Sequence, residues 1–259
     1  MTDTTYLDKI LAFHRKRAER DDRTLKELLR LIPAEQPREL SSRINEESRL
    51  SVIAEIKRRS PSKGPLNIEL NPAQLAKSYH EAGAAGVSVL TDSEHFSGSE
   101  SDLKEVRQVV NLPILRKDFT VDLRDICDAR IMGADCVLLI IAALNEDEVR
   151  EFHELTLDLG MEALVETHDE RELEIALNIG ARLVGVNQRD LKTFQVDQQR
   201  AISLSRKIPD EVVKVAESGI MAIQDAHALA KAGYDAVLVG EALVTTRNPR
   251  KFIEGLREL

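Results

Sequence analysis

The chain has 259 residues, of which 42% are hydrophobic, so it is long enough for one large α/β domain or two small ones. Its formal net charge of −9 argues against general nucleic-acid binding, and it has no apolar run of about 18 residues that would span a membrane. Cys127 and Cys136 are too few for a disulfide framework or a metal knuckle, and the first residues lack a signal-peptide pattern, so we expect a cytoplasmic protein.

Residues 1–47 are predicted to form a helical extension that precedes the main repeat. Within it, Tyr6–Arg20 and Thr24–Leu31 are heavily charged and have a helical pattern. Such an extension would either brace one end of the domain that follows or act as a lid over its functional site. The sequence favours neither alternative.

From about residue 50 onward, short apolar runs alternate with longer amphipathic stretches. The apolar runs predict strands at Ser51–Lys57, Gly86–Leu90, Pro113–Lys117, Ala134–Ile140, Glu162–Glu166, Leu183–Asn187, Val212–Glu217 and Ala236–Gly240. The amphipathic stretches predict helices at Pro72–Ala82, Ser101–Val110, Leu123–Met132, Glu146–Leu159, Glu170–Ile179, Gln198–Lys207, Ala222–Ala232 and Pro249–Leu259.

Eight strand-then-helix units in succession predict an α/β fold, a closed parallel (β/α)8 barrel of the triosephosphate-isomerase type. We therefore expect residues 1–259 to form a single barrel domain that includes the N-terminal extension. The competing architecture is an open, doubly wound sheet. That fold more often has fewer strands and a glycine-rich phosphate loop after the first one, which this sequence lacks.

Polar residues fall at the ends of the predicted strands, where barrels of this type build their active sites. In the first strand, Glu55 and Lys57 are two residues apart and therefore share a face with Ile53. Opposite charges inside a barrel are seldom kept without a use, although a structural ion pair is the alternative. Other strands end in Lys117, Glu166, Asn187, Glu217–Gly219 and Gly240–Glu241. One such residue is usually a solvated rim residue, but their convergence predicts a functional site.

The loops after the last two predicted strands have features of a phosphate site. Gly219 and Gly240 would let backbone N–H groups approach an oxyanion, and a short helix starting at Glu241 would direct its positive end toward it. Ordinary turn glycines are the alternative. The six histidines show no close ligand spacing, so no metal is predicted.

These motifs resemble the indole-3-glycerol-phosphate synthase family. The matching segments include every polar strand end named above: Ile53–Gly64, Val87–Ser99, Pro113–Asp122, Ala163–His168, Gly185–Asp197, Ala216–Ile220 and Leu238–Leu243. The resemblance implies a carbon–carbon lyase without cofactor. It would close 1-(2-carboxyphenylamino)-1-deoxyribulose 5-phosphate to indole-3-glycerol phosphate, losing carbon dioxide and water.

The resemblance also implies roles for individual residues. Lys117 would be the general acid of ring closure and Glu166 the acid–base carboxylate. Lys57 would be a second cation near the phosphate or carboxylate, or the dehydration acid, and Glu55 would hold the lysines in place. Asn187 and Ser218 would position substrate hydroxyls. The implied substrate-binding residues are Ser60, Phe96, Phe119, Arg189, Glu217, Gly219, Leu238, Gly240 and Glu241.

The roles of Arg189 and Glu241 have further conditions, and two other functions are alternatives to this one. Arg189 would meet the substrate carboxylate or order its loop, and Glu241 stands where some relatives carry Ser, so its carboxylate should turn away from the phosphate. The nearest rival enzyme, phosphoribosylanthranilate isomerase, needs a Cys/Asp pair, but the first strand ends in Lys57. A non-catalytic phosphate-binding module is the other alternative. The expected partner is a phosphorylated small molecule, and we expect a monomer or weak homodimer.

Overall fold

The computed structural model describes residues 5–190 and 193–258 of the chain. Leu191 and Lys192 belong to one of the family-like segments, and Leu259 was predicted to end the last helix. These three residues, and the first four of the predicted extension, lie outside the described part.

Eight parallel strands pair side by side and close into a barrel. The barrel closes because β1 pairs with β4 on one side and with β10 on the other. The strands are β1 (Ser51–Ile56), β4 (Gly86–Leu90), β5 (Ile114–Lys117), β6 (Cys136–Ile140), β7 (Glu162–Thr167), β8 (Leu183–Asn187), β9 (Val213–Glu217) and β10 (Ala236–Val239). The predicted (β/α)8 barrel is confirmed.

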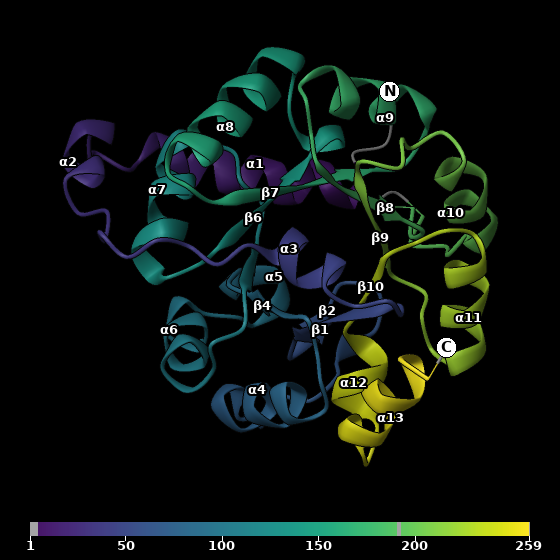
Figure 1. Cartoon of the computed structure of the whole chain (residues 1–259). Coiled ribbons are helices and arrows are strands. Elements are labelled where there is room, and N and C mark those ends of the chain that lie inside the picture. Colours follow the sequence, from purple (N-terminus) through teal and green to yellow (C-terminus); the bar gives the residue numbers. More distant parts are fainter. Residues whose placement is uncertain (1–4, 191–192, 259) are drawn as a thin grey trace.

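Helices surround the strands on the outside of the barrel (Figure 1). The eight that were predicted are α4 (Pro72–Glu81), α6 (Glu100–Val109), α7 (Leu123–Met132), α8 (Glu146–Asp158), α9 (Glu170–Asn178), α10 (Gln198–Ser205), α11 (Ile223–Lys231) and α13 (Pro249–Leu256). A short helix starting at Glu241 was also predicted, and α12 (Glu241–Thr245) confirms it. The sequence did not indicate α5 (Ser93–Phe96), η1 (Ile141–Ala143) or the hairpin of β2 (Arg59–Ser60) and β3 (Gly64–Pro65).

The side chains of β1 alternate between two hydrophobic layers. Ile53 belongs to the cluster inside the barrel, whereas Val52, Ala54 and Ile56 pack in the layer between the strands and the outer helices. This alternation confirms the face assignment that placed Glu55 on the inner side. The predicted end of this strand was wrong by a residue: β1 ends at Ile56, so Lys57 is the first residue after the strand. Other predicted strand ends differ from the structure by one or two residues.

Three helices precede the barrel, and the first and the third lie at opposite ends of it. The third, α3 (Leu40–Asn45), was not predicted. Its Leu40 and Ile44 are buried in the inner cluster, and the backbone N–H of Ser41 donates to Glu162, the first residue of β7, at 3.0 Å. It therefore covers the amino-terminal end of the strands and lies in front of them in Figure 1.

The first helix, α1 (Tyr6–Glu19), lies behind the strands in the same view. It begins with a capping box in which Thr5 and Asp8 exchange hydrogen bonds. The remaining N-terminal helix, α2 (Leu25–Leu29), packs against α7. No helix in the described part of the chain has both the length and the apolar character needed to cross a bilayer.

Candidate active site

A pocket opens at the carboxyl-terminal ends of the barrel strands, on the side where α1 lies. All fifteen residues proposed for the site from the sequence line this pocket. They are Glu55, Lys57, Ser60, Phe96, Phe119, Lys117, Glu166, Asn187, Arg189, Glu217, Ser218, Gly219, Leu238, Gly240 and Glu241. The parallel strands bring them together because their carboxyl ends meet at one end of the barrel.

The ammonium group of Lys117, at the end of β5, lies between two buried carboxylates. Its Nζ is 3.5 Å from Glu166 Oε2 on β7 and 3.6 Å from Glu217 Oε2 on β9. Burial lowers the pKa of Lys117, but the charges of Glu166, Glu217 and Glu55 outweigh this effect and raise the pKa above its usual value. The lysine therefore carries its proton at neutral pH.

The two carboxylates beside Lys117 have opposite pKa shifts. Burial raises the pKa of Glu166, but Lys117, His168 and Asn187 together lower it to about 2. Burial and the negative charge of Glu166 raise the pKa of Glu217 to about 8. One carboxylate is thus ionised at neutral pH and the other holds a proton, which is the arrangement that a site with separate acid and base steps requires.

Glu55 and Lys57 form an ion pair at the end of β1. Gly240 faces this pair, and a Cβ at that position would collide with the carboxylate of Glu55 and come within 3.0 Å of Lys57 Nζ. The φ of Gly240 is −121°, so its backbone does not need glycine. The glycine is therefore required for space around the ion pair.

Arg189 lines the rim of the pocket, and a further cation, Lys63, lies beside it near Glu241. The Arg189 guanidinium donates to Ser62 Oγ at 3.4 Å and to the backbone oxygen of Phe194 at 3.2 Å, so it connects the segment between β2 and β3 with Phe194. The carboxylate of Glu241 lies 3.8 Å from Arg189 and 3.8 Å from Lys63. It therefore offsets part of the positive charge at this rim.

Aromatic rings form one wall of the pocket. The ring centroids of Phe96 and Phe119 are 6.3 Å apart, and the ring of Tyr6, on α1, meets that of Phe194 edge-on at 5.3 Å. In the loop after β9, Ser218 and Gly219 both have left-handed backbone, with φ of 65° and 74°. A serine in this region is uncommon and often marks a functional turn.

Comparison with known proteins assigns the chain to a family. A sequence model described as indole-3-glycerol phosphate synthase matches residues 7–256. This chain belongs to the indole-3-glycerol phosphate synthase family. Two relatives of that name come from Arthrobacter sp. (strain FB24), 53% identical over 79% of this chain and 75% of the relative, and Kineococcus radiotolerans, 47% identical over 97% and 94%.

A solved structure titled 3-hexulose-6-phosphate synthase has the same fold at only 15% identity. It superposes with a TM-score of 0.64 and covers 80% of this chain and 98% of its own. At this identity the likeness concerns the barrel alone.

Sequence reasoning missed several pocket residues of this synthase-family chain. Tyr6, Leu7 and Ile10 of α1 line the pocket, and their helical spacing was a signal that α1 has an apolar face. His168 does not line this pocket but contacts Glu166, and it was missed although it shares strand parity with Glu166, the same rule that linked Glu55 to Lys57. Its Nε2 lies 3.3 Å from Glu166 Oε1.

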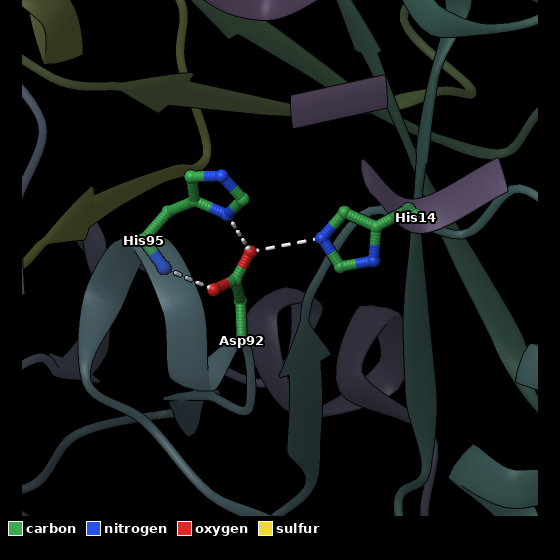
Figure 2. A group of neighbouring side chains, drawn as sticks. All are labelled: His14, Asp92 and His95. Atoms are coloured by element: carbon green, nitrogen blue, oxygen red, sulfur yellow. Dashed lines mark hydrogen bonds and ion pairs between the residues drawn. The ribbon is translucent and has the colours of Figure 1, made fainter. Parts of the chain in front are cut away.

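A second polar cluster joins α1 to the wall of the pocket (Figure 2). Asp92 Oδ2 lies 2.9 Å from His14 Nε2 and 2.8 Å from His95 Nδ1, and Asp92 Oδ1 accepts the backbone N–H of His95 at 2.6 Å. The three side chains have spacing that could hold a metal ion. In this structure of the synthase-family chain, one ring nitrogen of His14 and one of His95 hydrogen-bond to the Asp92 carboxylate. The cluster therefore links α1 to α5.

Proposed function

We propose that this chain converts 1-(2-carboxyphenylamino)-1-deoxyribulose 5-phosphate to indole-3-glycerol phosphate, releasing carbon dioxide and water. The observation that carries the proposal is the Lys117 ammonium between Glu166 and Glu217, inside a pocket with an aromatic wall and a cationic rim. Because carbon dioxide leaves by breakage of a carbon–carbon bond, the reaction is that of a carbon–carbon lyase.

Lys117 serves as the acid of ring closure. When the anthranilate ring attacks the ribulose C2 carbonyl, negative charge develops on the carbonyl oxygen, and a proton from the Lys117 ammonium neutralises it. The neighbouring carboxylates keep the lysine protonated between turnovers. A positioned acid of this kind typically contributes roughly 10²–10⁴-fold to the rate.

The two carboxylates divide the later steps. After carbon dioxide leaves and the ring becomes aromatic again, the new hydroxyl must leave as water, and a proton must leave the five-membered ring. Glu217 holds a proton near neutral pH and serves as the acid for the hydroxyl. Glu166 is ionised and serves as the base. Lys57, paired with Glu55, assists the dehydration or holds the substrate carboxylate.

The charges of the substrate fit the rim of the pocket. Its phosphate and carboxylate would meet Arg189, Lys63 and the backbone of Ser218–Gly219 and Gly240, which all border the opening or lie beside it. Phe96 and Phe119 would pack against the anthranilate ring. The net charge of −9 therefore does not prevent a locally positive entrance.

The test is turnover of Lys117→Ala, followed by indole fluorescence, which has a low background because the chain contains no Trp. We expect kcat to fall by roughly 10²–10⁴-fold because the acid is lost, while the substrate still binds. Lys104→Ala is the matched control, since Lys104 is exposed on α6 and pairs with Glu100. Near-normal turnover of Lys117→Ala would remove Lys117 from the mechanism.

A further inference from the structure

His168 lies between two carboxylates just outside the proposed catalytic group. Its Nε2 is 3.3 Å from Glu166 Oε1, and its Nδ1 is 3.0 Å from Glu172 Oε2. Its side chain is 12% exposed. A neutral imidazole can donate from only one of its nitrogens, so a ring that faces a carboxylate on each side is suited to the doubly protonated, cationic form.

Glu172 fixes the position of this ring. Its carboxylate also accepts the backbone N–H of His168 at 2.7 Å. Glu172 belongs to the first turn of α9, where its own backbone N–H donates to the capping residue Asp169 at 2.9 Å. The imidazole is therefore attached to a helix terminus and does not depend on a flexible loop.

The two oxygens of Glu166 have different surroundings. Oε1 accepts a hydrogen bond from Asn187 Nδ2 at 3.0 Å and faces His168. Oε2 faces Lys117 at 3.5 Å and has no hydrogen-bond partner among the described residues. Oε1 is therefore fixed by Asn187 and His168, and Oε2 is directed toward the pocket, where a substrate would lie.

The charge of Glu166 needs this support because other acids lie nearby. The charged groups around Glu166 and His168 are Lys117 from β5, Glu217 from β9, Glu55 from β1 and Glu172 from α9. Glu217 and Glu55 are the acidic residues near Glu166, and Lys117 interacts with all three of these carboxylates. A second cation behind Glu166 keeps it ionised without occupying the pocket.

We propose that His168 is a positioning residue whose imidazolium, anchored by Glu172, orients Glu166 and keeps it ionised as the base of the reaction. The proposal rests on the proposed function. Burial lowers the pKa of His168, but Glu166 and Glu172 raise it to about 10, so the ring stays cationic across neutral pH.

The test compares the pH dependence of kcat in the wild type and in His168→Gln. The wild type should show no acid limb down to about pH 5, because the pKa of Glu166 is about 2. In His168→Gln the pKa of Glu166 rises, so kcat should begin to fall on the acid side at a higher pH than in the wild type. We expect kcat to fall about tenfold from pH 8 to the acid end, with KM changed by less than about threefold.

Three further variants separate this role from a structural one. His168→Lys retains a cation beside Glu166, so its kcat should again be independent of pH on the acid side. Glu172→Gln removes the anchor and should produce a smaller shift in the same direction. His80→Gln changes an exposed histidine on α4 in the same way and should leave the profile unchanged. An activity loss in His168→Gln that is equal at every pH would overturn the proposal.

A measurement without turnover separates failure of this inference from failure of the proposed function. Proton–nitrogen NMR of the histidine rings should find His168 doubly protonated at pH 8, while Glu172→Gln should lower the pH at which it titrates. If His168 titrates together with the exposed His80, the inference is wrong even in an active enzyme. If the wild type has no turnover but the ring is doubly protonated, the cationic state of His168 is confirmed, and the proposed role of His168 in this reaction is wrong.

Discussion

Glu166 and Glu217 show how neighbouring residues of one type acquire different properties. Both are buried and both lie within 3.6 Å of Lys117 Nζ. Glu166 accepts a hydrogen bond from Asn187 and forms an ion pair with His168. Glu217 lacks this support, and its position is permitted because Gly185 has no side chain: a Cβ there would collide with Glu217. The difference in pKa follows from these contacts.

The opposite shifts predict opposite effects on stability. The pKa of Glu217 is raised to about 8, so its contribution to stability is present below its unfolded pKa and is lost as pH rises through about 8. Glu217→Gln cannot ionise, so its Tm should exceed that of the wild type by more at pH 9 than at pH 5. The expected gain is about 2–4 °C per kcal/mol recovered.

Glu166→Gln is the matched comparison. The pKa of Glu166 is lowered to about 2, so its contribution is present above the unfolded pKa and is lost as pH falls toward 2. Its Gln variant should be less stable than the wild type at pH 7, and the difference should narrow below about pH 4. Thermal melts of both variants that shift in the same direction at pH 7 to 9 would contradict the assignment of acid and base.

The site residues could be predicted from the sequence where strand alternation applied. Glu55 and Lys57 were paired by parity, and the structure confirms the pair. Glu166 and His168 are also two residues apart, but the predicted strand ended at Glu166, so His168 was not assigned to the same face. The pKa difference between Glu166 and Glu217 could not be predicted, because it depends on Asn187 and on the space at Gly185, which come from another strand.

Among the elements, α1 has the most direct connection to function. It contributes Tyr6, Leu7 and Ile10 to the pocket wall. A helix of 14 residues is marginal by itself in water, so its order depends on docking. Salt bridges from Arg15 to Glu148 and from Arg17 to Asp125 attach its outer side, and His14 attaches its inner side to Asp92.

Removal of the inner attachment should loosen the pocket wall. In His14→Ala, the buried carboxylate of Asp92 loses one donor, which typically costs about 1–3 kcal/mol. We expect KM to rise several-fold, with a smaller change in kcat, and hydrogen exchange of Tyr6–Glu19 to become faster. Lys16→Ala, an exposed change on the same helix, is the control. Unchanged KM and unchanged exchange in His14→Ala would show that α1 is held in other ways.

The two alternatives for the N-terminal extension both describe part of the structure. α1 lines the mouth of the pocket, as a lid would, and α3 braces the opposite end of the barrel. The sequence could not indicate α3, because a helix of six residues without a side-chain cap has little periodicity. Its position depends on Leu40 and Ile44 entering the barrel interior, which is a tertiary contact.

At the scale of the whole molecule, the barrel was predictable because its signal repeats. Eight apolar runs separated by amphipathic stretches define the strand order, and helix ends were placed to within three residues. The short elements β2, β3, α5 and η1 were not predicted, since each is four residues or fewer. They lie in connections after strands, where tertiary packing decides the backbone.

The overall charge and the local charge of the molecule have different consequences. The chain is acidic, yet the pocket places Lys57, Lys117 and Arg189 at one end of the barrel. Glu166, Glu217 and Glu55 inside the same pocket raise the pKa of Lys117. We therefore expect one pocket to perform ring closure, decarboxylation and dehydration with its own acids and base.

The most direct test is to incubate the protein with 1-(2-carboxyphenylamino)-1-deoxyribulose 5-phosphate and to follow indole fluorescence and carbon dioxide release together. We expect both to rise at the same rate, with one carbon dioxide for each indole formed and no added cofactor. Saturable binding of the substrate without release of either product would contradict it, and would indicate a phosphate-binding barrel that does not catalyse the reaction.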